Sequence, residues 1–294
     1  MKFRFAKKSD KEEILKFCID TFEWGDYINQ VWDMWFYESN GALFVAEDET
    51  RNNKGSTIAF SHVSLCPHRR KIWLEGIRVN PDHRRRSIAT ELIRKMLSYG
   101  KRKGAREASA IVAVNNLPSQ LMMKKSGFNV ISKWIYSSFD NPPQKFGNFN
   151  ARIATFNDIK KIQNYLKQSA TYKSSGKRYV NSWRWYSFDS KNLSDIIKHR
   201  KLIIAENDII EGMTIIDGDG YWNKNNVFQI VYLDSIDVSS LYDLIGFAMM
   251  LVQSAHDRYK RIQIFAPQTS QISSVIRELN IINPDEFLLY GKPI

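Results

Sequence analysis

The residues whose types and spacing are most typical of a ligand-binding site lie at a strand-to-helix junction within residues 73–93. An apolar strand ends at Val79, a tight Asn-Pro-Asp turn follows, and the arginines of Arg84–Thr90 then lead into an amphipathic helix. The first turn of a helix presents unpaired backbone N–H groups and the positive end of the helix dipole. Because guanidinium groups add charged donors, this junction predicts a pyrophosphate-binding loop.

The elements that must position this loop alternate along the first half of the chain. In the helix after the loop, Ile88, Leu92 and Met96 share one stripe, and Gly104 follows as a stop signal. The order predicts an α/β (α+β) fold with a mixed central β-sheet flanked by helices. The predicted strands are Lys2–Phe5, Ala42–Glu47, Thr57–Leu65, Ile72–Val79, Glu107–Val114 and Phe128–Phe139, and the predicted helices are Glu12–Thr21, Tyr27–Tyr37, Ser87–Lys103 and Leu117–Ser126.

The second half of the chain repeats features of the first in the same order. Shared order favours an internal duplication, so we predict a first domain at 1–140, a linker at 141–150 and a second, similar domain at 151–294. The matching pairs are Arg4…Asp10 with Arg152…Asp158, Trp32–Tyr37 with Trp183–Tyr186, and Leu43–Glu47 with Leu202–Glu206. The later helix, strand and short helix recur at Leu241–Ala255, Arg261–Ala266 and Gln271–Leu279.

Composition limits the class of protein. The chain has 294 residues, of which 43% are hydrophobic, yet it has no apolar run long enough to cross a bilayer and no signal-peptide pattern. Two cysteines are too few for a disulfide framework or a metal cluster, so we expect an intracellular, cytoplasmic protein without a metal or membrane partner. The net charge of +12 suits nucleic acid, an acidic protein or a polyphosphate cofactor. No nucleic-acid-binding motif accompanies it, which disfavours nucleic acid.

The loop and two flanking segments resemble the GNAT superfamily of acetyl-CoA-dependent N-acetyltransferases. Arg84–Ala89 lies on the family's pattern Arg/Gln-x-x-Gly-x-Gly/Ala, and Val79–Arg84 is typical of its strand-to-loop turn. Asn116–Phe128 resembles the family's later Asn-x-x-Ala-x-x-Leu-Tyr-Glu-Lys-x-Gly-Phe segment. The resemblance covers the first half strongly and the repeat weakly, and it implies acetyl-CoA as cofactor with CoA as product. The implied cofactor contacts are Ile77, Val79, Arg84, Arg85, Arg86, Ser87, Ile88, Ala89, Thr90 and Asn116.

Two positions depart from the family pattern. Ser87 replaces a loop glycine, which is harmless in a helical conformation and harmful if the position needs a positive φ. Met123 stands where the family often has a tyrosine that protonates the departing thiolate, and methionine has no proton to donate.

Glu75 is the leading candidate for the base that deprotonates the acceptor amine. It lies in the strand before the loop, where the superfamily often places its base, and the neighbouring Trp73 and Leu74 would raise its pKa. The alternative is a carboxylate that faces solvent or pairs with Arg78. Three histidines near this region, at positions 62, 68 and 83, are secondary candidates for a proton relay.

Other residues near the site have two interpretations each. Asn116 could contact CoA, cap the helix that begins at Leu117, or do both. The aromatic segment Trp24–Tyr37 could pack against the sheet or line an acceptor pocket.

The second repeat lacks the basic loop. Asp234–Ser240 occupies its place, and an acidic segment would repel a pyrophosphate, so we expect a degenerate GNAT-like domain without cofactor. The function predicted overall is acetyl transfer from acetyl-CoA to a primary amine. The alternative is a non-catalytic CoA-sensing or basic nucleic-acid- or protein-binding module. The acceptor and the oligomeric state stay open.

Overall fold

The computed structural model describes residues 1–22, 25–50, 55–66, 70–140, 150–218, 226–255, 258–279 and 284–294. Contacts divide the chain into two compact units. Unit 1 comprises Met1–Val112, Asn116–Val130 and Leu289–Ile294, and unit 2 comprises Ala113–Asn115 and Ile131–Leu288. Except for Asn150, the predicted linker at 141–150 lies outside the described residues.

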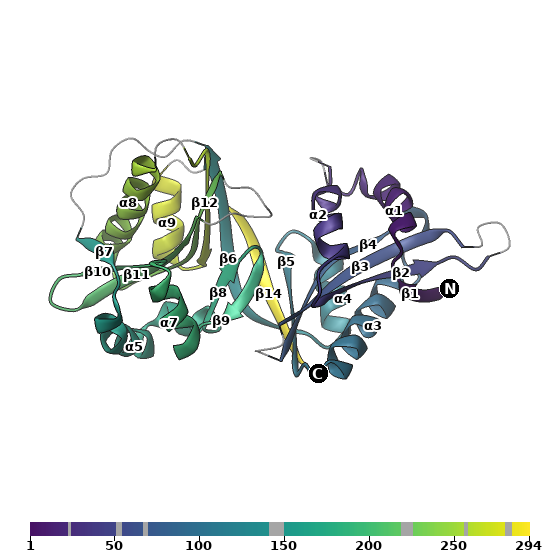
Figure 1. Cartoon of the computed structure of the whole chain (residues 1–294), viewed down its shortest axis with the longest axis horizontal. Coiled ribbons are helices and arrows are strands. Elements are labelled where there is room, and N and C mark those ends of the chain that lie inside the picture. Colours follow the sequence, from purple (N-terminus) through teal and green to yellow (C-terminus); the bar gives the residue numbers. More distant parts are fainter. Residues whose placement is uncertain are drawn as a thin grey trace. The chain divides into compact units, whose positions relative to one another are not determined.

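Unit 1 is a mixed sheet with helices on both faces. Neighbouring strands are antiparallel from β1 to β4, and β4 and β5 are parallel. Helices α1 and α2 cover one face and α3 and α4 the other (Figure 1). The strands, in sheet order, are β1 (Lys2–Phe5), β2 (Gly41–Glu47), β3 (Thr57–Cys66), β4 (Lys71–Val79) and β5 (Glu107–Ala113), and the helices are α1 (Lys11–Cys18), α2 (Ile28–Phe36), α3 (Ile88–Arg102) and α4 (Leu117–Lys125).

The helical stripe predicted after the loop is confirmed. Ile88, Leu92 and Met96 of α3 are at most 2% exposed, and Trp32 and Trp35 of α2 are buried on the opposite face of the sheet. These apolar side chains hold the helices against the sheet and so fix where the loop before α3 begins.

The strand that follows α4 belongs mostly to unit 2. In β6 (Asn129–Asp140), the residues from Trp134 to Asp140 pair antiparallel with β13 (Arg261–Pro267). The sequence placed this strand in the first domain, with a boundary at 140, whereas the contacts divide the chain after Val130. A strand pattern shows which face is apolar but not which strand is its partner.

The last residues of the chain belong to unit 1. They form the end of β14 (Asp285–Pro293). The Lys292 ammonium donates a hydrogen bond of 2.6 Å to the Ser126 carbonyl after α4, and the Ile294 amide donates one of 3.0 Å to the Arg106 carbonyl before β5. Unit 1 is therefore built from both ends of the chain.

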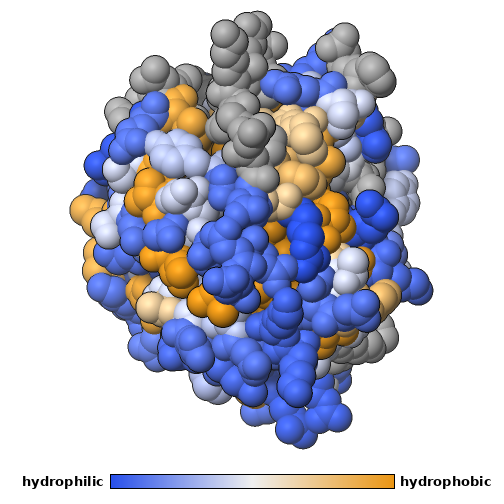
Figure 2. Space-filling model, turned by 90° about the vertical axis from the view of Figure 1, so that its left-hand side faces the viewer, coloured by the Kyte–Doolittle hydropathy of each residue, from blue (hydrophilic) through white to orange (hydrophobic). Residues whose placement is uncertain are grey.

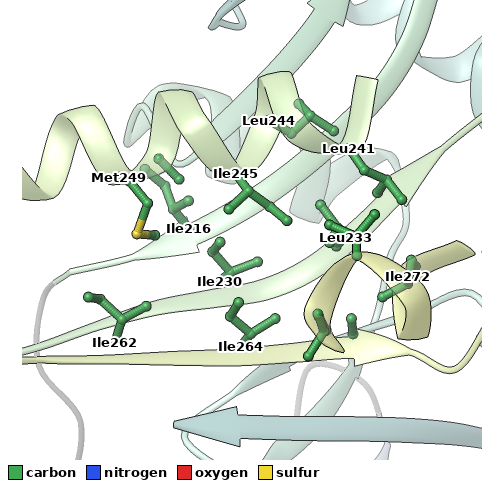
Figure 3. Close-up of a cluster of buried hydrophobic side chains, with 14 of the residues drawn as sticks. Ile216, Ile230, Leu233, Leu241, Leu244, Ile245, Met249, Ile262, Ile264 and Ile272 are labelled. Atoms are coloured by element: carbon green, nitrogen blue, oxygen red, sulfur yellow. The ribbon is translucent and has the colours of Figure 1, made fainter. Parts of the chain in front are cut away.

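Unit 2 repeats the plan of unit 1. A cluster of buried side chains from α8, among them Leu244, Ile245 and Met249, packs on Ile230 and Ile264 of the sheet (Figure 3). Helices α8 and α9 cover one face of the sheet and α5 and α7 the other (Figure 1). The sheet order is β6, β13, β12 (Val227–Ser235), β11 (Ile210–Asp217), β10 (Leu202–Glu206) and β7 (Ala151–Ile153), and the helices are α5 (Ile159–Gln168), α6 (Ala170–Ser174), α7 (Ser190–Lys198), α8 (Val238–Ser254) and α9 (Ser270–Glu278).

One face of unit 2 is mainly hydrophilic. Figure 2 shows hydrophilic residues over most of this face, with smaller hydrophobic areas between them. Such a surface suits helices that turn one apolar stripe to the sheet and their charged side to water. Among the described helices of the whole chain, none combines the length and the apolar character that a membrane span requires.

The duplication is visible in a matching ion-pair network at the start of each unit. Arg4 of β1 binds Asp10 at 2.8 Å, and Arg152 of β7 binds Asp158 at 2.8 Å. In each unit the arginine also pairs with the glutamate that ends the neighbouring strand, as Arg152 does with Glu206. The predicted match of the two segments is therefore confirmed in three dimensions.

The Asp158 pair predicts an acid-sensitive contribution to stability. The hydrogen bond from Arg152 holds the pKa of Asp158 well below its usual range, so its stabilisation is complete above about pH 4 and is lost as the pH falls further. We expect Asp158→Asn to lower the free energy of unfolding by about 1–2 kcal/mol at pH 7, and by much less at pH 2. Urea titrations at both pH values measure this. Asp195→Asn, an exposed carboxylate of α7, is the control, and an equal effect at both pH values contradicts the account.

One predicted match between the repeats is wrong. Trp32–Tyr37 falls mostly in helix α2, whereas Trp183–Tyr186 lies at a hairpin between β8 (Arg178–Asn181) and β9 (Arg184–Ser187). Ser182 and Trp183 both have positive φ, the conformation of a two-residue hairpin turn, so a helix cannot continue there.

Candidate active site

The central strand of unit 1 is bent by a bulge beside Glu75. Phe60 of β3 pairs with Arg78 of β4, but His62 pairs with Glu75, so β4 carries one extra residue. Gly76 in this segment has a φ of +66°, and a Cβ there would lie 2.5 Å from a ring carbon of Trp35. Only glycine suits both the backbone and the ring, and a bulge of this kind re-aims the residues around it.

Beyond the bulge, β4 has an open edge. Its parallel ladder with β5 joins Lys71–Trp73 to Glu107–Ser109 and continues no further in the described residues. The described ladder with β5 therefore does not reach Gly76–Val79. An extended chain that carries amides could add to such an edge as a further strand would.

The open edge leads into the arginine loop. The residues from Arg84 to Ser87 are exposed, while Ile88 is buried and begins α3. No carboxylate lies within ion-pair distance of Arg85 or Arg86 in the part of the chain that the structure describes. The loop thus brings unneutralised guanidinium groups and the N-terminus of a fifteen-residue helix together, which is an anion-binding arrangement.

The backbone conformation of Ser87 shows whether this position requires the positive φ that glycine favours. It has φ 59° and ψ 13°, which is the left-handed conformation that glycine favours, and its side chain makes no capping hydrogen bond. A non-glycine residue is strained there by about 1 kcal/mol.

We therefore expect Ser87→Gly to raise the free energy of unfolding by about 0.5–1 kcal/mol. Urea titration of both proteins measures the change. The matched control is Ser98→Gly on the exposed side of α3, which should lower stability by about 0.5 kcal/mol because glycine disfavours a helix interior. If both variants lose stability to the same extent, Ser87 is not strained.

Glu75 faces a buried histidine rather than open solvent. Its Oε1 lies 2.9 Å from Nδ1 of His62, and the Glu75 side chain is only 12% exposed. The interpretation of Glu75 as a solvent-facing carboxylate is therefore wrong. Arg78, the other partner considered, pairs with Asp26 at 2.7 Å.

His62 joins Glu75 to a second carboxylate. Its ring is fully buried and stacks on Trp35 at 4.6 Å between ring centroids. Its Nε2 lies 3.4 Å from Oε2 of Glu38, whose other oxygen accepts a hydrogen bond from Ser64. Glu38 is 20% exposed, so a continuous row of titratable groups runs from Glu75 towards the surface of unit 1.

The remaining sequence candidates take other places. His83 lies 3.2 Å from Asp48, outside the Glu75 cluster, and His68 lies outside the described residues, as does Trp24. Asn116 caps α4, since its Oδ1 accepts from the Ser119 amide at 3.1 Å. Met123 is 1% exposed and packs in the core.

Sequence analysis missed Glu38 and gave His62 only a secondary place. Each is separated from Glu75 along the chain, and the β3–β4 register that joins His62 to Glu75 depends on the bulge. The one available signal was Gly76 directly after a strand carboxylate, because glycine inside a strand often marks a bulge.

Unit 2 keeps the strand geometry but not the loop. Tyr232 pairs with Ile215 and Ile230 with Ile216, so β12 is bulged like β4. Its parallel ladder with β13 ends at Ile230. Only two residues separate β12 from α8, and the second, Asp237, caps α8 by accepting from the Ser240 amide at 2.8 Å. A carboxylate thus occupies the place where unit 1 presents its arginines.

Unit 1 thus combines a bulged central strand, a parallel pair with a short ladder, and a basic loop at a helix N-terminus. The profile of the acetyltransferase (GNAT) family matches residues 11–128, and this segment of the chain belongs to the GNAT family.

Relatives with a known activity match part of the chain. An aminoglycoside N(6')-acetyltransferase type 1 from Acinetobacter haemolyticus is 34% identical over 83 residues, which are 28% of this chain and 57% of the relative. The chain thus spans little more than half the length of that relative.

Solved structures extend the likeness to the whole chain. A tandem GNAT protein from the clavulanic acid biosynthesis pathway has a TM-score of 0.54 at 11% identity, with 99% of this chain and 98% of that chain covered. A GCN5-related N-acetyltransferase from Sphaerobacter thermophilus has a TM-score of 0.59 at 12% identity, with 99% and 95% covered. The predicted tandem of two GNAT-like folds is confirmed.

Proposed function

We propose that unit 1 transfers the acetyl group of acetyl-CoA to a primary amine, with Glu75 as the general base. One observation carries this proposal: Glu75 lies one residue before the Gly76 bulge, at the open edge of β4, and is held by the buried His62. A nearly buried carboxylate beside an open strand edge can meet both an amine and a bound thioester.

The residues around the open edge suit each part of acetyl-CoA. Arg84, Arg85 and Arg86 would bind the pyrophosphate together with the N–H groups of Ser87, Ile88, Ala89 and Thr90 at the start of α3. Backbone groups of Ile77 and Val79 would pair with the pantetheine amides, and Asn116 would add a contact beside its capping role. Bound there, the cosubstrate supplies the thioester carbon that the amine attacks.

The carboxylate row supplies a path for the proton. Glu75 removes a proton from the ammonium form of the acceptor, and the neutral nitrogen then bonds to the thioester carbonyl carbon. As the C–S bond breaks, the nitrogen loses a second proton to water, which leaves the neutral amide. The removed proton can pass from Glu75 to His62. Nε2 of His62 lies 3.4 Å from Oε2 of Glu38 without a hydrogen bond between them, so the last step to Glu38 requires a closer approach of the two side chains. Because Met123 has no proton to give, the thiolate takes its proton from water.

For the acceptor we propose only its chemical class, a primary amine. Relatives that match part of the chain include aminoglycoside acetyltransferases, so aminoglycosides are the first acceptors to test. Amino acids, polyamines and peptide N-termini complete the panel, because a base at the bulge acts on any primary amine that reaches it.

Release of the CoA thiol during incubation with acetyl-CoA and each amine tests the proposed function. We expect at least one amine to be acetylated, with one thiol released per amide formed. If acetyl-CoA raises the melting temperature but no amine in the panel is acetylated, the CoA-sensing alternative is favoured instead.

A further inference from the structure

Unit 2 contains a cavity of about 710 Å³ that the proposed acetyl transfer does not use. It lies between α5 and α6 on one side and the carboxyl ends of β12 and β13 on the other, and its lining includes Tyr165, Ser169, Asp234, Thr269 and Gln271. Cavities of this volume hold small molecules, and the place where parallel strands separate is a usual binding position in α/β folds.

A buried carboxylate without a cationic partner forms the floor of this cavity. Asp234 is 1% exposed and accepts hydrogen bonds from Ser169 Oγ at 2.6 Å and from the Tyr232 hydroxyl at 2.9 Å. Both partners are neutral, and no lysine, arginine or histidine of the described residues lies within ion-pair distance of it. Burial raises the pKa of this carboxyl group. A buried carboxylate is stabilised by a nearby positive charge, and here a bound cationic ligand could supply that charge.

A second buried polar group lines the same cavity. Tyr165 is 8% exposed, and its hydroxyl interacts with Asp234 without reaching good hydrogen-bonding geometry. Buried hydroxyls nearly always have a well-aligned partner, so this hydroxyl can still bond to a ligand in the cavity.

The other residues that line the cavity indicate which chemical groups the ligand carries. Most of the polar lining residues are neutral amides and hydroxyls, and the one lysine, Lys161, already binds Glu206 at 2.6 Å. No arginine lines the cavity. A phosphate would therefore meet carboxylates without free cations, whereas hydroxyl groups would find both donors and acceptors. The neutral polar lining includes Asn164, Gln168, Ser169, Thr171 and Gln271.

We propose that the cavity of unit 2 binds a small polyhydroxylated amine of the amino-sugar class. Its ammonium group pairs with Asp234, and its hydroxyls bond to Tyr165 and the neutral polar lining. The lining of this cavity shares no residue with the arginine loop or the Glu75 cluster, and the proposal does not depend on acetyl transfer in unit 1.

Isothermal titration of the full chain with three probes tests the proposal: glucosamine, glucose, which keeps the hydroxyls, and spermidine, which keeps the amines. We expect glucosamine to bind at least tenfold more tightly than either of the others. Asp234→Asn keeps the shape and the ability to accept hydrogen bonds but removes the charge, so it should weaken glucosamine binding at least tenfold. Asp195→Asn, an exposed carboxylate of α7 outside the cavity lining, should leave it unchanged.

A second variant guards against loss of folding in Asp234→Asn. Ala170 lines the cavity from an exposed position, so Ala170→Trp fills space without entering the core and should also abolish binding. Three results would each overturn the proposal: no binding of glucosamine, equal binding of glucosamine and glucose, or binding that survives both variants but is lost in Glu38→Gln of unit 1.

Discussion

Glu75→Gln is expected to lower kcat for amine acetylation by about 10²–10⁴-fold while acetyl-CoA binding stays intact. Glutamine has the same shape but cannot take a proton at neutral pH, and Glu75 is 12% exposed beside His62, so few other groups can replace it. Steady-state release of CoA thiol measures kcat, and titration calorimetry measures acetyl-CoA binding.

The controls separate chemistry from structure. Glu12→Gln removes a carboxylate from α1 whose side chain is 85% exposed, and it should leave kcat unchanged. His62→Gln should reduce kcat less than Glu75→Gln does and should alter the pH profile of kcat. The reason is that His62 accepts the proton only after Glu75 has removed it from the amine. Full activity in Glu75→Gln would show that Glu75 is not the general base, whatever the effect of His62→Gln.

The second large effect is expected on acetyl-CoA binding when arginines of the loop Arg84–Thr90 are replaced. Arg84→Ala combined with Arg86→Ala should weaken acetyl-CoA binding by about 10²-fold or more, because each charge-assisted contact to a phosphate contributes about 1.5–3 kcal/mol. At a concentration of acetyl-CoA near 100 times the wild-type Kd, ligand binding adds about 2.7 kcal/mol to stability, and the double variant should lose most of that gain. Melting temperature with and without acetyl-CoA measures it.

A matched double variant controls for the change in charge. Arg94→Ala with Lys101→Ala removes two positive charges from exposed positions of α3 outside the loop. Its melting temperature should rise with acetyl-CoA as the wild type's does, apart from a small loss of long-range attraction that added salt screens. An equal loss in both double variants would mean that net charge, not the loop, attracts the cofactor.

Local patterns predicted much of the site. The arginine loop, the helix stripe of Ile88, Leu92 and Met96, and the cap at Asn116 each depend on residues within one or two turns of chain. Such features follow from capping and periodicity alone. The Arg4 and Arg152 networks were equally visible, because each arginine and its aspartate are six positions apart.

The features that sequence analysis missed are non-local. The partnership of His62 with Glu75 requires the register of two strands, and one extra residue at the bulge shifts that register. The use of Leu289–Ile294 in unit 1 joins the end of the chain to its first half, which no local pattern shows. The β8–β9 hairpin was mistaken for a helical repeat because matching aromatic residues outweighed the turn at Ser182 and Trp183.

Hydrogen–deuterium exchange with and without saturating acetyl-CoA tests the central claim most directly, since it needs no known acceptor. We expect slower exchange at Leu74–Val79 and Ser87–Glu91 of unit 1, and unchanged exchange at Leu233–Ser240 of unit 2. Slower exchange at Leu233–Ser240, or unchanged exchange at the arginine loop of a protein shown to be saturated, would contradict it.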